Sequence, residues 1–290
     1  MAQRMNNMKI TERDIYLLLF IFSNRGCKRD QIINKFFGDV ALRTANARLK
    51  TLTDFDYLVA EREAILSQKV YYITKKCLSF LKKSELVDNR IKALPRFTLS
   101  GRIHDLDVID IRIALEADNI LKISDWTTEY ELALHSNRGI INIDRNNIRS
   151  VRRPDGLFTI KKEGFARPFI LEYIRERYGK ERLYKILNII EYQYPFYSVL
   201  LVFRDLDEAA KCLVKINERG RWLGKYIVTF KDSIIENNGL SGAVVYKGNQ
   251  KPPEFKHWKE VYTPLAKESL IGSAEIKQNS VNCNKESENY

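Results

Sequence analysis

Two carboxylates, Asp155 and Glu172, have the residue type and setting of metal ligands. Asp155 follows a proline and precedes a short apolar run, and Glu172 lies within a second apolar run, FILEYI. Two carboxylates at the ends of adjacent strands can hold Mg²⁺, which activates a water molecule and offsets the charge of an attacked phosphate. The pattern therefore predicts a phosphodiester-cleaving site in which Asp155 and Glu172 bind the metal and act in catalysis.

The basic residue that usually completes such a site is missing from its expected position. A Lys two residues after the Glu would lie on the same strand face, because side chains alternate between faces. Here that residue is Ile174, so Lys180 or Lys185 in the following segment would have to supply a displaced basic group. The alternative interpretation is a simple turn at Pro154-Asp155-Gly156 and a solvated strand residue at position 172. The sequence leaves open a cleaving site, a degenerate site and a plain strand pair.

The elements that would position the carboxylates form an α/β pattern. We predict a helix in RIHDLDVIDIRIALEADN, three strands in ISDWTTEYELAL, IRSVRRPDGLFTI and ARPFILEYIRER, and then alternating helices and strands. This order predicts a mixed sheet flanked by helices and resembles the PD-(D/E)XK, or restriction-endonuclease-like, fold. Glu129 and Glu131 would share one strand face. His104 is either a base or metal ligand near the site, or a residue that packs at a helix start.

The first ninety residues predict three helices, a two-stranded hairpin and a fourth helix. Thr11 and Asp14 form a capping box at the start of the first helix. In the third helix, predicted from about residue 40 to 55, one buried face is formed by Leu42, Ala45, Leu49 and Leu52. The strands DYLVAERE and KVYYIT and the helix KKCLSFLKK follow. This order predicts a winged helix-turn-helix whose third helix is the recognition element.

Basic and small polar residues on the other faces of the third helix are the predicted contacts to double-stranded DNA. They are Arg43, Thr44, Asn46, Ala47, Arg48 and Lys50. Such side chains can approach phosphates and base edges. The net charge of +12, from 49 basic and 37 acidic residues, suits a polyanionic partner. A solvated charged face and a winged helix that mediates protein contacts are the alternatives.

Composition argues against several classes of protein and indicates a cellular compartment. Four scattered cysteines without a CxxC pair argue against zinc and against a disulfide framework. No apolar run is long enough to span a bilayer and the start lacks a secretory signal, so we expect a cytoplasmic protein without a membrane partner. We expect a winged helix over 1–90, a linker over 91–101, the nuclease-like domain over 102–265 and a disordered tail over 266–290.

Several motifs together are similar to the replication-relaxation family of plasmids and mobile elements. They are ITERDIYLLLFIF, KVYYIT, HDLDVIDIRIAL, VRRPDGLF, FILEYIRE and YSVLLVF, spread over about residues 10–230. The resemblance implies a winged helix joined to a PD-(D/E)XK-like domain that binds at an origin of replication or transfer. In relaxase-type members it implies metal-dependent nicking, for which Asp155 and Glu172 are the matching positions. Ile174 departs from that pattern.

Three functional hypotheses follow. The first is a DNA-binding protein of a plasmid or mobile element, acting in replication, relaxation or mobilisation, with a degenerate nuclease-like site. The second is an active Mg²⁺-dependent endonuclease or nickase that uses Asp155, Glu172 and Lys180 or Lys185. The third is a transcriptional repressor whose second domain senses a signal or dimerises. Other replication or mobilisation proteins and a second copy of the chain are further candidate partners.

Overall fold

The computed structural model describes residues 8–62, 68–98, 101–136, 153–162, 165–176, 179–218, 225–247 and 256–257. The described helices are α1 (Glu12–Ser23), α2 (Arg29–Phe36), α3 (Leu42–Asp54), α4 (Lys75–Lys83), α5 (Arg102–Glu116), α6 (Glu129–Ser136), α7 (Lys180–Gln193), α8 (Leu206–Glu218) and α9 (Lys231–Glu236). The described strands are β1 (Cys27–Lys28), β2 (Leu58–Arg62), β3 (Lys69–Ile73), β4 (Lys122–Thr128), β5 (Gly156–Lys162), β6 (Phe165–Ile174), β7 (Ser198–Phe203), β8 (Tyr226–Phe230), β9 (Val244–Lys247) and β10 (Lys256–His257). The predicted disordered tail, 266–290, lies outside these residues.

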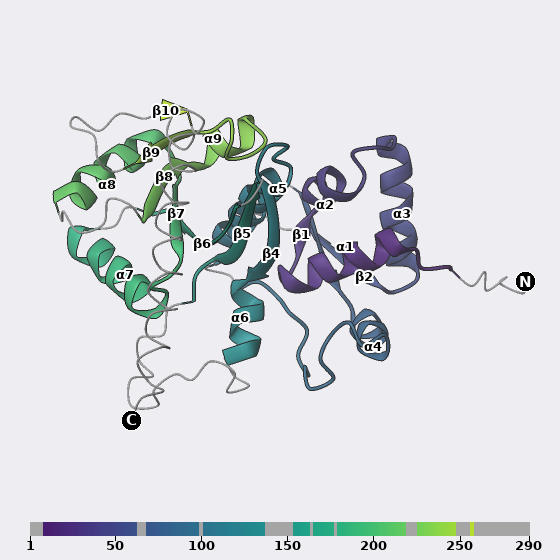
Figure 1. Ribbon diagram of the computed structural model, residues 1–290. Helices are drawn as coiled ribbons and strands as arrows, with labels where there is room; N and C mark the ends of the chain where they lie inside the picture. The colour runs from purple at the N-terminus through teal and green to yellow at the C-terminus, as the bar shows by residue number, and fades with distance from the viewer. Residues whose placement is uncertain are drawn as a thin grey trace, which may run out of the picture. The chain divides into compact units, whose positions relative to one another are not determined.

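The chain divides into two compact units, both visible in Figure 1. The first comprises Met1–Ile113 and Thr127–Asp155, and the second comprises Ala114–Trp126 and Gly156–Tyr290. Both helices and strands are present, with a small antiparallel sheet in the first unit and a larger mixed sheet in the second. The fold class is therefore mixed α and β, as the sequence predicts. None of the described helices is long and apolar enough to cross a membrane.

The first unit is built on a short sheet in the order β1-β3-β2, in which both pairs are antiparallel. The capping box predicted at the start of α1 is present. The amide of Asp14 donates to the hydroxyl of Thr11 at 3.3 Å, and the amide of Thr11 donates to the carboxylate of Asp14 at 2.7 Å. These bonds satisfy amides that a helix start leaves without partners. They fix the first residue of α1 at Glu12.

Helix α3 packs one face on the core of this unit. Ala45, Leu49 and Leu52 are fully buried there, as their spacing predicts. The expectation for Leu42 is wrong, because this side chain is 55% exposed. Leu42 is the first residue of the helix, one turn before the buried face begins, and therefore extends past the core.

Segments beyond residue 90 complete the first unit. Ile91 and Phe97, from the predicted linker, are buried in the same core as the first helices. From α5, Leu106 and Ile109 enter this core. The side chain of Gln31 on α2 donates to the carbonyl of Leu106 at 2.7 Å, which fixes α2 against α5. The compact unit consequently continues past the boundary at residue 101 that the sequence suggests.

The strand predicted in ISDWTTEYELAL ends halfway, and this part of the prediction is wrong. Strand β4 stops at Thr128, and Glu129 begins α6. The amide of Glu131 donates to the hydroxyl of Thr128 at 3.2 Å, and the amide of Thr128 donates to the carboxylate of Glu131 at 2.8 Å. This reciprocal pair is a second capping box, and it starts a helix where alternation of Tyr130 and Leu132 had suggested a strand.

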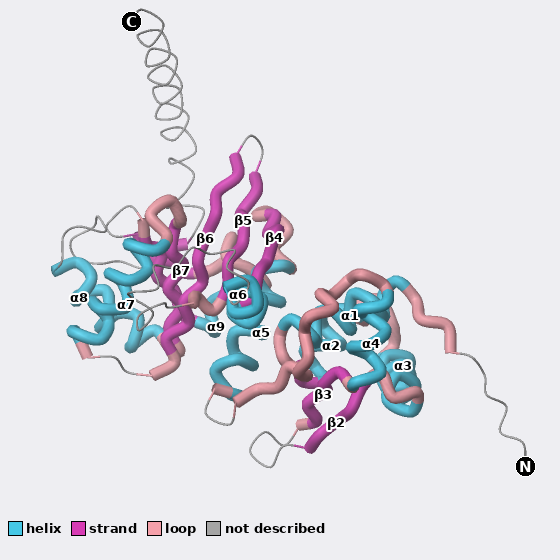
Figure 2. The backbone as a smooth tube through the Cα atoms, turned by 90° about the horizontal axis from the view of Figure 1, so that it is seen from below, coloured by secondary structure: helices cyan, strands magenta, loops and turns pink. Residues whose placement is uncertain are grey.

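In the second unit, the described strands form a sheet in the order β10-β9-β8-β7-β6-β5-β4. Strands β6, β7 and β8 are parallel neighbours, and β5 and β9 flank them in antiparallel pairs. Figure 2 shows β4, β5, β6 and β7 side by side. Helices α7 and α8 pack together on one face of the sheet, over a core that includes Ile170, Leu201 and Val228.

A row of stacked rings runs across β4, β5 and β6. Trp126 stacks on Phe158 with ring centroids 5.1 Å apart, and Phe158 stacks on Phe169 at 5.6 Å. Phe158 and Phe169 are direct partners in the antiparallel ladder. Aromatic rings on neighbouring strands hold the register of a sheet, so the row fixes β5 against β6 next to the Glu172 position.

Candidate nucleic-acid interface and carboxylate positions

The outer face of α3 presents most of the predicted DNA contacts to solvent. Arg43, Thr44, Ala47 and Lys50 are exposed, whereas Asn46 is half-buried. The spacing of Arg43, Ala47 and Lys50 puts them on one side of the helix. Lys50 lies 2.7 Å from Asp54 in an exposed pair one turn along, which solvent screens. Among the described residues, Arg43 makes no ion pair, so its guanidinium is available to a phosphate or a base edge.

Arg48, also a predicted DNA contact, is half-buried and hydrogen-bonded within the first unit. Its Nε donates to a carboxylate oxygen of Asp14 at 2.9 Å, and its Nη2 donates to the other oxygen and to the carbonyl of Lys9. Asp14 is only 1% exposed. A carboxylate in this position needs a partner because burial without one is costly. The contacts of Arg48 therefore do not support its prediction as a DNA contact and give it a structural role.

The same bonds control the ionisation of Asp14. Burial by itself raises the pKa of this carboxyl, but the hydrogen bonds donated by Arg48 and Thr11 outweigh it. The pKa of Asp14 is consequently lowered below its ordinary value. The same hydrogen bonds, which Arg48 donates to Asp14, raise the pKa of Arg48. The pair is therefore ionised at neutral pH and joins the first turn of α1 to the middle of α3.

A second basic feature lies where β2 and β3 meet the loop that joins them. Arg62 and Lys69 are cross-strand partners in the antiparallel ladder, and both are exposed. Like charges directly opposite each other destabilise a hairpin. Sequence reasoning missed this pair, although the equal distance of the two residues from the loop would have revealed it. An anion placed between the two side chains would relieve their repulsion.

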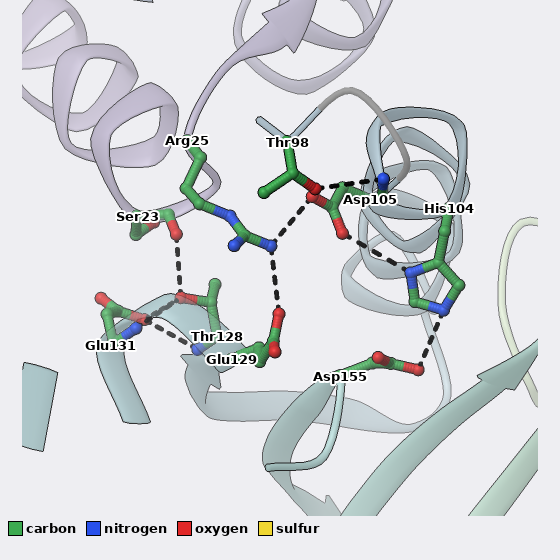
Figure 3. A network of polar contacts seen from close by, with 10 residues as sticks. Ser23, Arg25, Thr98, His104, Asp105, Thr128, Glu129, Glu131 and Asp155 are labelled. Carbon is green, nitrogen blue, oxygen red and sulfur yellow. Dashed lines mark hydrogen bonds and ion pairs between the residues drawn. The ribbon is translucent and has the colours of Figure 1, made fainter. Parts of the chain in front are cut away.

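An ion-pair network holds α5 and α6 against the turn before β1 (Figure 3). The Nη2 of Arg25 lies 2.9 Å from a carboxylate oxygen of Asp105 and 3.0 Å from one of Glu129. Nearby, the hydroxyl of Thr128 donates to the carbonyl of Ser23 at 2.9 Å. Glu129, which the sequence placed on a strand face with Glu131, is thus the first residue of α6 and a partner of Arg25.

His104 connects this network to Asp155 (Figure 3). Its Nδ1 lies 3.5 Å from an oxygen of Asp105, and its Nε2 lies 3.5 Å from an oxygen of Asp155. Asp155 immediately precedes β5 and is largely enclosed, with its side chain 13% exposed. The imidazole therefore orients the carboxylate that the sequence predicts as a metal ligand, from within the first unit.

Glu172 lies in β6 of the second unit and is fully buried. Alternation puts it on the same strand face as Ile170 and Ile174. Those two residues pack into the core beneath α7 and α8. Ile174, at the position where a nuclease would carry Lys, is thus an apolar core residue.

The two lysines proposed as a displaced basic group lie on the outer side of α7. Lys180 and Lys185 are exposed, whereas Leu183, Ile186 and Leu187 form the buried face of this helix. Lys180 lies over the ring of Tyr184 at 5.7 Å. Helix geometry therefore points Lys185 away from the sheet that carries Glu172.

The described residues do not fit the predicted magnesium site. No three of their His, Cys, Asp and Glu side chains converge in a group able to hold a metal ion. Mg²⁺ requires carboxylate and other oxygen ligands in a near-octahedral arrangement. Asp155 instead contacts His104, and Glu172 lies on a face shared with isoleucines.

Comparison of the chain with family models, with curated proteins and with solved structures finds no match in any of the three.

Proposed function

We propose that the chain is a DNA-binding protein whose first unit is a winged helix-turn-helix. The proposal rests chiefly on the exposed face of α3, where Arg43, Thr44, Ala47 and Lys50 point to solvent. The order α1, α2, α3 followed by the β2–β3 hairpin matches this module, in which the third helix enters the major groove. Arg62 and Lys69 are both positively charged and face each other across the hairpin, which supports a phosphate contact from it.

The biological role that we propose is replication, relaxation or mobilisation of a plasmid or mobile element. It is supported by the motifs similar to the replication-relaxation family, and the second unit would be a nuclease-like domain with a degenerate site. The arrangement of β5, β6, α7 and β7 is compatible with that architecture. The burial of Ile174 and the outward position of Lys185 favour the degenerate site over an active one.

Replacing Arg43 with alanine should weaken binding to duplex DNA by about tenfold to a hundredfold. An Arg that contacts a base edge contributes about 1 to 3 kcal/mol, and among the described residues Arg43 has no ion-pair partner to lose. Fluorescence anisotropy with a labelled duplex from the element's own origin region measures the effect. Arg90→Ala removes the same charge from the same unit at an exposed ion pair with Asp88, and it should bind nearly as well as the natural chain.

Two results would contradict the proposal. The first is equal affinity of the Arg43 and Arg90 variants. The second is an affinity that does not fall as salt rises, because phosphate contacts release counterions. Binding to a promoter palindrome in preference to the origin region would instead support the transcriptional repressor.

We expect no metal-dependent nicking. Supercoiled plasmid carrying the origin region should stay supercoiled with Mg²⁺ or Mn²⁺, with the natural chain and with Glu172→Ala alike. The physical reason is that the described carboxylates do not converge on a metal and the nearby basic side chains on α7 point outward. Gel electrophoresis of the plasmid reports the result. Nicking by the natural chain that disappears in Glu172→Ala would establish the nickase instead.

A further inference from the structure

Two aromatic rings near the end of α7 are exposed to an unusual degree. Tyr192 and Phe196 are each 89% exposed, whereas the next most exposed large apolar side chain among the described residues, Tyr16, is 57% exposed. Single exposed apolar side chains are common on protein surfaces, but two almost fully exposed aromatic rings four residues apart are uncommon. They form a local feature of the second unit that the duplex contacts proposed for α3 do not use.

The turn that carries Phe196 is held firmly. Its flanking residues Tyr194 and Tyr197 pack edge to face, with ring centroids 5.7 Å apart, and both rest against the core beneath α7 and α8. The Nζ of Lys225 donates to the carbonyls of Tyr194 at 2.8 Å and Pro195 at 3.2 Å. Because the neighbouring tyrosines point inward, the ring of Phe196 is presented outward from a fixed backbone.

The helix face leading to Tyr192 is polar and partly basic. Lys185, Asn188 and Tyr192 are exposed and follow one another at spacings of three and four, so they share the outer side of α7. The centre of a protein interface is apolar and well packed. The ring of Tyr192 lies one turn from an asparagine and two turns from a lysine and therefore lacks such surroundings, and its flat face remains accessible.

We propose that Tyr192 and Phe196 form a stacking platform for the bases of single-stranded DNA. Every base offers a π-face, and exposed aromatic side chains beside cations are the usual means of binding single strands without sequence preference. In a duplex those faces are already stacked on each other, so the platform distinguishes a single strand from a double helix. Lys185 on the same helix face and the net charge of +12 complement the phosphate backbone.

The test compares the affinity for single-stranded DNA of a double variant that keeps both aromatic rings with that of a double variant that replaces them with leucine. Anisotropy of a labelled oligothymidine of about 20 nucleotides, longer than the roughly 4 to 16 that such sites cover, measures affinity in the full chain. Tyr192→Leu with Phe196→Leu should weaken binding by at least about tenfold, whereas Tyr192→Phe with Phe196→Tyr should change it by less than about twofold. Both side chains are exposed, so the fold is retained, and circular dichroism verifies this.

Duplex binding separates this proposal from the one made for α3. The leucine pair should leave duplex affinity unchanged, and Arg43→Ala should leave oligothymidine affinity unchanged. If the leucine pair binds oligothymidine as well as the natural chain, the platform does not exist. If the leucine pair instead changes the sedimentation of the chain and leaves oligothymidine binding intact, the rings join two copies of the protein and the proposal is overturned.

Discussion

Replacing Gly26 with alanine is expected to lower the free energy of unfolding by about 4 kcal/mol, the sum of a backbone and a packing contribution. Gly26 has a φ of +145°, a conformation that residues with a side chain rarely adopt. An added Cβ would lie 2.7 Å from the ring of Tyr72 and 2.9 Å from that of Phe97. Both rings are buried and contact each other edge to face, so neither has room to withdraw.

Chemical denaturation followed by circular dichroism measures this loss. Gly38→Ala is the matched control in the same unit, because the nearest atom to its added Cβ is a carbonyl oxygen at 3.7 Å, an ordinary contact. It should change the free energy of unfolding by less than about 0.5 kcal/mol. A loss for Gly26→Ala as small as that for Gly38→Ala would show that the turn before β1 tolerates a side chain.

Replacing Arg48 with alanine should lower the free energy of unfolding by about 3 kcal/mol, because it leaves a buried carboxylate without its cation. Among the described residues, the carboxylate of Asp14 would then keep bonds with Thr11 alone. Arg43→Ala, five residues earlier on the same helix, removes an exposed arginine and should leave stability nearly unchanged. The two variants thus separate folding from DNA contact within a single helix, and thermal unfolding together with anisotropy distinguishes them.

The effect of Arg48→Ala should depend on pH. The pKa of Asp14 is lowered in the folded chain, so its contribution to stability is fully present above its unfolded pKa and is lost as the pH falls through the folded value. The difference in stability between the natural chain and Arg48→Ala should therefore shrink as the pH drops below about 4. A difference that stays constant from neutral to acidic pH would show that Arg48 stabilises the fold by packing alone.

Local signals in the sequence predicted local structure well. The start of α1 was predictable because the capping box of Thr11 and Asp14 spans only four residues. The capping box of Thr128 and Glu131 was equally local, but the alternation of apolar residues around it suggested a strand. The two signals at this position favour different structures. The capping box provides hydrogen-bond partners for the free amides of a helix start, and the structure has the helix.

Long-range pairing could not be predicted in this way. Periodicity put Arg48 on the outer side of α3, and only the folded position of Asp14, 34 residues earlier, shows that its guanidinium turns back to the core. Alternation likewise placed Glu172 and Ile174 on one strand face, but which face α7 and α8 cover is decided by tertiary packing. For both the α3 surface and the Glu172 position, sequence-based prediction therefore could not give the side-chain environment, because contacts between residues distant in sequence determine it.

The ion pairs of Arg25 can form only after much of the chain has been synthesised. Arg25 is separated by 80 residues from Asp105 and by 104 residues from Glu129. The ribosome releases α1, α2, α3 and the β2–β3 hairpin before either carboxylate is synthesised. At about 5 to 20 residues per second, Arg25 waits roughly 5 to 20 seconds for its second partner. Until α5 and then α6 have been synthesised, the nascent chain exposes the apolar surface that these helices later cover.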